Sequence, residues 1–152
     1  MSIDMWLSPI ISQRLSELEH VFLGCANATA EESTDWLLVA YRVLAQSQQL
    51  QTIELPDSAD FLALVAVGGL ESATLSLLPA AAGYMVSRGP SGATIASVIL
   101  PGVSMESTAE GDGVTLALLG ALFAAILSST EARMMPATGK GLNSPISTSR
   151  GH

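Results

Sequence analysis

The first part of the chain carries apolar residues at helical spacing. They recur at intervals of three or four residues, and they are Leu7, Ile11, Leu15, Leu18, Phe22 and Cys25. This spacing places side chains on one face of an α-helix. The pattern therefore predicts an amphipathic helix over residues 7–25, and Gly24 and Asn27 are residues that commonly end a helix.

A second helix is predicted to begin at Thr29. The Thr29 hydroxyl and the Glu32 carboxylate have the spacing of a capping box, in which each side chain accepts a hydrogen bond from the other residue's backbone N–H. The helix dipole favours acidic side chains in such a first turn. The apolar stripe that follows consists of Trp36, Ala40, Val43, Leu44 and Ser47. The two helices form a hairpin or pack against the residues that follow, and the pattern leaves both arrangements open.

A third helix is predicted over residues 59–78. Asp57 or Ser58 can cap it, Gly68-Gly69 interrupts it and Pro79 ends it. After Pro79 the period changes from helical to alternating, which is typical of strands. The expected strands are 83–88, 93–100 and 103–110, with turns at 89–92 and 101–102. In the last of these strands, one face carries Val103, Met105, Ser107 and Ala109, and the other carries Ser104, Glu106, Thr108 and Glu110.

The longest apolar run, residues 114–128, predicts a final helix capped by Asp112. It is apolar on nearly every side, so we expect it to be buried on the sheet or against a neighbour. Residues 131–152 are rich in Pro, Gly, Ser and Thr, which is typical of a disordered tail. The predicted fold class is therefore α+β: an N-terminal helical pair (1–55), a sandwich of helix, three-stranded antiparallel sheet and helix (56–130), and the tail.

Charge narrows the choice of partners. The 152 residues carry a net charge of −8 with only six Lys and Arg, so a phosphate-binding surface is not expected and nucleic acid is a disfavoured ligand. The first 60 residues hold nine acidic residues against Arg14 and Arg42. The candidate interaction surface is Glu31, Glu32, Asp35 and Trp36. Its acids either attract a basic partner, as in a DNA mimic, or simply keep the helix solvated.

The residues that could carry chemistry are few. Glu17 and His20 have the spacing of a metal-binding pair on a helix, but His152 is the only other histidine, so we expect no metal. Cys25 lies on the apolar stripe of the first helix, where an inert, buried thiol is expected. There is no nucleophile elbow and no phosphate-binding loop. We therefore expect no enzymatic activity and no cofactor.

Hydropathy raises the question of a membrane. The chain is 49% hydrophobic, but the apolar stretches 61–70 and 114–127 are shorter than the roughly 20 residues of a spanning helix and lack flanking Lys and Arg. The start Met-Ser-Ile-Asp-Met-Trp carries no signal-peptide pattern. A cytoplasmic protein is the expectation. A membrane-associated hairpin of the third and last helices is the alternative.

Several segments resemble the phage ABA sandwich domain family. The segments are Leu75-Ser-Leu-Leu-Pro79, Gly83-Tyr84, Ala93-Thr-Ile-Ala-Ser-Val98, Ala109-Glu-Gly111 and Leu116-Ala-Leu-Leu-Gly-Ala-Leu122. The resemblance covers about residues 57–128. Two features depart from it: Asp57-Ser-Ala-Asp60 only partly matches the family's Tyr-Thr and Leu-Asp-Ala opening, and Val114-Thr115 replaces the Thr-Pro that starts its last helix. The resemblance implies a small phage or prophage protein and provides no catalytic residues.

These expectations together predict a non-enzymatic protein that acts through protein–protein interaction. One version is an acidic inhibitor of a host factor, acting in the cytoplasm of the host cell. The alternatives are the membrane-associated hairpin and a minor structural or assembly component of a virion. Self-association is also expected, because the edge strands of a three-stranded sheet can pair between subunits.

Overall fold

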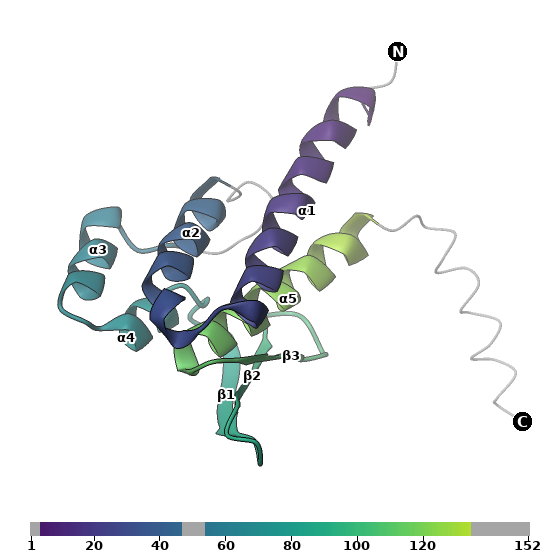
Figure 1. The fold of residues 1–152 in the computed structure, drawn as a ribbon. Helices are drawn as coiled ribbons and strands as arrows, with labels where there is room; N and C mark the ends of the chain where they lie inside the picture. Colours follow the sequence, from purple (N-terminus) through teal and green to yellow (C-terminus); the bar gives the residue numbers. More distant parts are fainter. Residues whose placement is uncertain (1–3, 47–53, 135–152) are drawn as a thin grey trace, which may run out of the picture.

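The computed structural model of the chain describes residues 4–46 and 54–134 (Figure 1). The elements are α1 (Asp4–Asn27), a 3₁₀ turn η1 (Ala30–Glu32), α2 (Ser33–Gln46), α3 (Ser58–Ala66), α4 (Leu70–Leu75), β1 (Gly83–Arg88), β2 (Thr94–Ile99), β3 (Ser107–Gly111) and α5 (Val114–Met134). The predicted α+β class is confirmed. Most of the predicted tail, residues 135–152, lies outside the described residues, but α5 continues to Met134 and so extends past the predicted start of the tail.

The three strands form an antiparallel sheet in the order β1-β2-β3. The Gly89–Gly92 turn joins β1 to β2 as predicted. The Gly92 N–H donates to the Gly89 carbonyl at 3.0 Å and the Gly89 N–H donates to the Ala93 carbonyl at 2.8 Å. Gly92 has a φ of 91°, which glycine adopts without the steric penalty of a β-carbon. The turn therefore fixes a register in which Val86 lies opposite Ala96.

The third strand is shorter than predicted. It begins at Ser107, and the predicted residues 103–106 form no strand. The reason is the register, in which Ser107 pairs with Val98 near the end of β2. Continuing this pairing backward would set Val103 opposite Gly102, its own neighbour in the turn. Val103 and Met105 are consequently 39% and 76% exposed, and the apolar face predicted for them is wrong.

The interrupted third helix is two separate helices. Asp57 caps α3 as predicted, with its Oδ2 accepting from the Ala59 N–H at 3.2 Å. At the other end, the Gly69 N–H donates to the Leu64 carbonyl at 2.8 Å and the Gly68 N–H donates to the Val65 carbonyl at 3.0 Å. This is a Schellman motif, with Gly68 in the left-handed region at a φ of 81°. The Gly68-Gly69 pair thus ends α3 before α4 begins.

Helix α5 lies at the centre of the molecule. One of its sides packs on β2 and β3, and other sides pack on α1, α2 and α4 (Figure 1). Its first four turns are buried almost throughout, including Leu116, Leu119, Leu122 and Phe123. This explains why a helix with no polar face is stable, and it confirms the predicted burial of the apolar run.

The N-terminal helices share this core. Leu18 of α1, Leu37 of α2 and Phe61 of α3 belong to the same cluster of buried side chains as Leu119 of α5. Both arrangements that the sequence left open are present, because α1 packs on α2 and on α5. Helices α3 and α4 lie against each other, and α4 also contacts α2 and α5.

The sheet face that points away from α5 is largely open among the described residues. Thr94, Ala96 and Val98 of β2 are buried and point toward α5. The alternate positions form the outer face, where Met85 is 65% exposed and Ile99 is 39% exposed. Among the described helices, none is long and apolar enough to cross a membrane.

Candidate interaction surface

The predicted interaction residues lie at the start of α2. The Thr29 N–H donates to Glu32 Oε1 at 2.9 Å, so Glu32 takes its predicted part in capping, although the turn it closes is the 3₁₀ turn η1. Glu31, Glu32 and Asp35 are all exposed to solvent. Glu31 and Asp35 make no hydrogen bond or ion pair within the described part of the chain, so both carboxylates are available to a partner.

A further acidic residue, Asp112, lies between β3 and α5 and contacts η1. It was predicted to cap α5, but its Oδ2 accepts from the backbone N–H of Ala30 at 2.8 Å. Gly113 instead precedes α5, and its carbonyl accepts from the Ala117 N–H at 3.1 Å. Asp112 therefore ties the β3–α5 connection to η1.

Glu71 completes the group. Together with Ala30, Ser33, Asp112 and Thr115 it borders a hollow of about 400 Å³. The starts of η1–α2, α4 and α5 meet around this hollow. The first backbone N–H groups of a helix have no partner within the helix, and they lie at the positive end of its dipole. Carboxylates stabilise such an arrangement. We call the exposed carboxylates of Glu31, Glu32, Asp35, Glu71 and Asp112 the acidic surface.

Trp36 lies partly buried between α1 and α2. Its ring stands 5.3 Å from the His20 ring at a tilt of 54°. A β-carbon at Gly24 would overlap the six-membered ring of Trp36, so any other residue at that position on α1 would have to displace the ring. Trp36 was predicted both in the apolar stripe of the second helix and in the candidate interaction surface. The structure packs it partly buried against the core, and its part in an interaction stays a prediction.

A shallow hollow is bordered by both Trp36 and the acidic residue Glu32. It has a volume of about 350 Å³ and is bordered by Leu23, Asn27, Glu32 and Trp36. Leu23 is 50% exposed, although it lies beside the buried stripe of α1. We call Leu23 and Trp36 the apolar ledge. Sequence reasoning missed Leu23 because it falls outside the stripe, and its proximity to Trp36 depends on how α1 and α2 cross.

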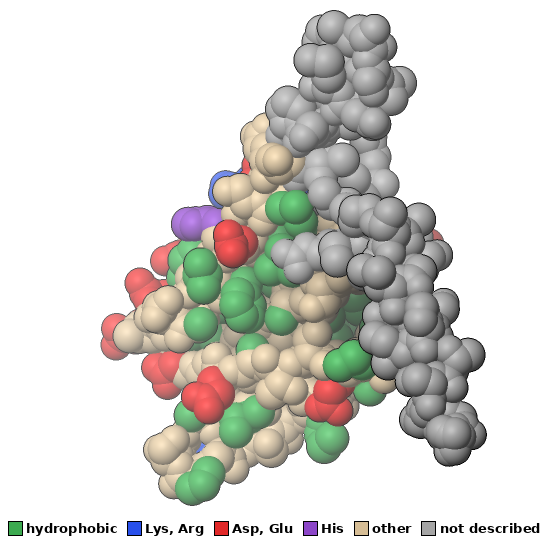
Figure 2. Space-filling model, turned by 90° about the vertical axis from the view of Figure 1, so that its right-hand side faces the viewer, with side chains coloured by type: hydrophobic (Ala, Val, Ile, Leu, Met, Phe, Trp, Pro, Cys, Tyr) green, Lys and Arg blue, Asp and Glu red, His purple; other side chains and the backbone are tan. Residues whose placement is uncertain are grey.

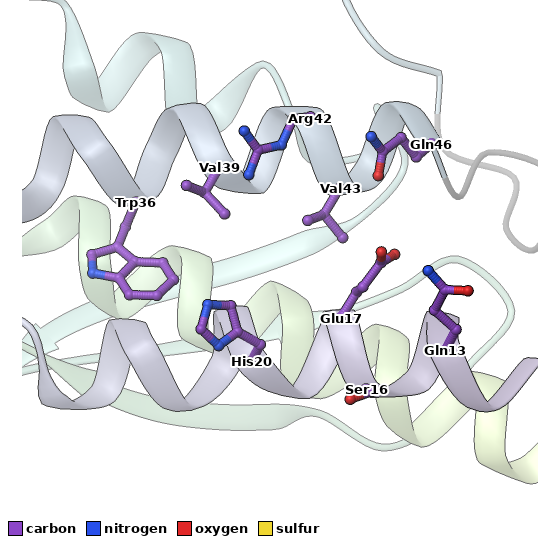
Figure 3. A pocket seen from close by; sticks show the side chains of 9 residues that line it. All are labelled: Gln13, Ser16, Glu17, His20, Trp36, Val39, Arg42, Val43 and Gln46. Carbon is purple, nitrogen blue, oxygen red and sulfur yellow. The ribbon is translucent and has the colours of Figure 1, made fainter.

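The larger cleft between α1 and α2 has a volume of about 660 Å³. Figure 3 shows the residues that line it: Gln13, Ser16, Glu17 and His20 on α1 and Val39, Arg42, Val43 and Gln46 on α2, with Trp36 at one end. Arg14 Nη1 lies 3.2 Å from Glu17 Oε1, so this carboxylate is already paired. In the described residues no group of three or more His, Cys, Asp and Glu side chains is placed to hold a metal ion, and His152 lies outside them. The cleft is therefore lined by hydrogen-bonding side chains, such as Gln13 and Gln46, together with the apolar Val39 and Val43.

Cys25 is buried at the α1 end of the core, as predicted. Desolvation raises the pKa of its thiol from 9.0 to about 12. A buried thiol is protonated at neutral pH and is a poor nucleophile.

Comparison with known proteins finds no matching family model, no similar curated protein and no similar solved structure. The resemblance to the phage ABA sandwich domain therefore stays a prediction.

Proposed function

We propose that this protein is a non-enzymatic interaction protein of phage or prophage type, which binds a basic protein partner through the acidic surface and the apolar ledge. The cytoplasm of the host cell is the proposed place of action. In one version of the proposal, binding inhibits the partner.

The observation that carries this proposal is the position of exposed carboxylates, two of them unpaired, close to the partly exposed side chains of Leu23 and Trp36. Glu31 and Asp35 flank the start of α2, and Leu23 and Trp36 lie next to Glu32. Protein–protein contacts commonly combine an aromatic or apolar anchor with charged groups around it. A basic segment would place its cations on the carboxylates and an apolar side chain on the ledge.

Charge across the whole molecule supports the same partner. The described part of the chain holds four cationic residues, Arg14, Arg42, Arg88 and Arg133, and Arg14 is paired with Glu17. Figure 2 shows acidic side chains spread over the visible face and few Lys or Arg side chains. Such a field speeds the approach of a basic partner and repels acidic ones.

The test is affinity capture with the full chain and matched variants. The Glu31→Gln/Asp35→Asn variant removes two charges and leaves the Glu32 cap in place. The Glu54→Gln/Asp60→Asn variant removes two exposed charges near the start of α3 and serves as the control. We expect a basic protein to be retained by the unmodified chain and the control, and lost with the first variant. Equal retention by all three chains, or a catalytic turnover by the purified protein, would overturn the proposal.

A further inference from the structure

We propose that the free edge of β1 pairs with β1 of a second copy of this chain, in antiparallel register with Val86 opposite Val86, to form a six-stranded sheet. This inference concerns a surface separate from the acidic surface. It would give a dimer that carries that surface twice.

The two edges of the sheet differ. Helix α1 packs against β3, and Glu110 and the preceding Glu106 place negative charge along that edge. Strand β1 pairs with β2 on one side, and its residues are exposed except for the half-buried Val86. It contains no proline, and Arg88 at its end is its single charged residue. Proteins commonly protect edge strands with prolines or charged side chains. Strand β1 has little of this protection, so its free edge is suited to pairing with another strand.

The hydrogen bonds of the turn identify which backbone groups are free. Gly89 donates its N–H to Ala93, directly opposite, so Gly89 faces β2. Along a strand the direction of the backbone groups alternates. Tyr84, Val86 and Arg88 therefore direct their N–H and C=O groups toward the free edge.

One register uses all of these groups. With Val86 opposite Val86 of the second copy, Tyr84 lies opposite Arg88 at both ends. Each of these pairs can exchange two N–H···O=C bonds. In this register the two-fold axis of the dimer passes through Val86. If the axis passed through Met85 instead, Arg88 would have no partner in β1 of the second copy, and if it passed through Ser87, Tyr84 would have none.

The side chains agree with this register. Tyr84 and Arg88 lie on the same face as Val86, which is the face toward α5, so each Arg88 guanidinium would meet the ring of a Tyr84 in a cation–π contact. Tyr84 is 52% exposed and thus available. On the outer face, Met85 lies opposite Ser87. No like charges face each other, and like charges directly opposite destabilise strand pairs.

Light scattering coupled to size exclusion tests the dimer with the full chain. We expect twice the 15.7 kDa chain mass. Val86→Pro removes the donor at the centre of the interface without removing a bond to β2, and we expect the dissociation constant to rise at least about tenfold with an unchanged circular dichroism spectrum. Val86→Thr keeps the donor and the β-branch, so this control should remain a dimer. A monomeric unmodified chain, or a folded Val86→Pro chain that dimerises equally well, would overturn the proposal.

Cysteine cross-linking tests the register even where Val86→Pro fails to fold. Met85→Cys and Ser87→Cys chains are mixed and treated with oxidised glutathione. The expected result is a disulfide-linked dimer of one chain of each kind, because these positions lie directly opposite each other. The buried thiol of Cys25 should not compete. Cross-linking of either variant with itself, at a yield equal to that of the mixture, would contradict this register.

Discussion

At the residue scale, the interface of α1 and α2 depends on a glycine facing a tryptophan. The missing side chain of Gly24 provides the space that the Trp36 ring fills, and the ring then rests against His20. The helical period identified both helices and the buried Cys25. It did not pair Gly24 with Trp36, because spacing within each helix says nothing about how two helices cross. Gly24 looked like a helix end in the sequence, whereas α1 continues to Asn27.

Adding a methyl group at Gly24 tests this contact. In an isolated helix, Gly→Ala stabilises by about 1 kcal/mol. Here we expect Gly24→Ala to lower the free energy of unfolding by about 1–3 kcal/mol, because the new carbon overlaps a rigid ring. Urea denaturation measures the change. Trp36→Leu in the Gly24→Ala chain should recover part of the loss, and a more stable Gly24→Ala single variant would refute the contact.

Cys25 predicts a pH dependence of stability. Below pH 9.0 the thiol is protonated in both the folded and the unfolded chain. Between 9.0 and about 12, the unfolded chain releases this proton while the folded chain retains it. The free energy of unfolding should therefore fall with rising pH in this range, with a contribution from Cys25 of up to about 1.4 kcal/mol per pH unit. Cys25→Ala should show a shallower slope in the same urea titrations, and parallel slopes would exclude this role.

At the element scale, the sequence predicted most elements and fewer of their limits. Alternation and turn residues located β1 and β2, and the apolar run located α5. The alternation at residues 103–106 was misleading, because a strand also needs a partner and β2 ends too early to pair with these residues. The role of Asp112 could not be predicted either, because its hydrogen bond to Ala30 joins residues far apart in the sequence.

The packing of α5 on β3 depends on small residues at their contact. A β-carbon on Gly111 would lie 2.5 Å from the Ala117 nitrogen and 2.8 Å from the Leu116 carbonyl carbon. Backbone atoms cannot move aside as side-chain ends do. We expect Gly111→Ala to lower the free energy of unfolding by about 3 kcal/mol. Gly83→Ala, where a β-carbon would meet nothing within 4 Å, should change it by less than about 0.5 kcal/mol. Equal thermal shifts for the two variants would contradict this packing.

At the scale of the whole molecule, α5 packs against α1, α2, α4, β2 and β3 and holds them around one core. The proposed function depends on the surface of the molecule. The sequence identified the acids at the start of α2 as a candidate surface. It could not add Leu23, Glu71 and Asp112, because these come from separate elements that only the fold brings together. The proposed result is a protein that recognises a basic partner at one side and pairs with itself at the β1 edge.

The most direct test of the proposed function is the affinity of the captured partner, measured by calorimetry at low and high salt. For the unmodified chain we expect binding to weaken as salt screens the acidic surface. For Glu31→Gln/Asp35→Asn we expect a dissociation constant at least about tenfold higher at low salt and less sensitive to salt. The Glu54→Gln/Asp60→Asn control should bind as the unmodified chain does. Equal affinity and equal salt dependence for all three chains would contradict the central claim that the acidic surface binds the partner.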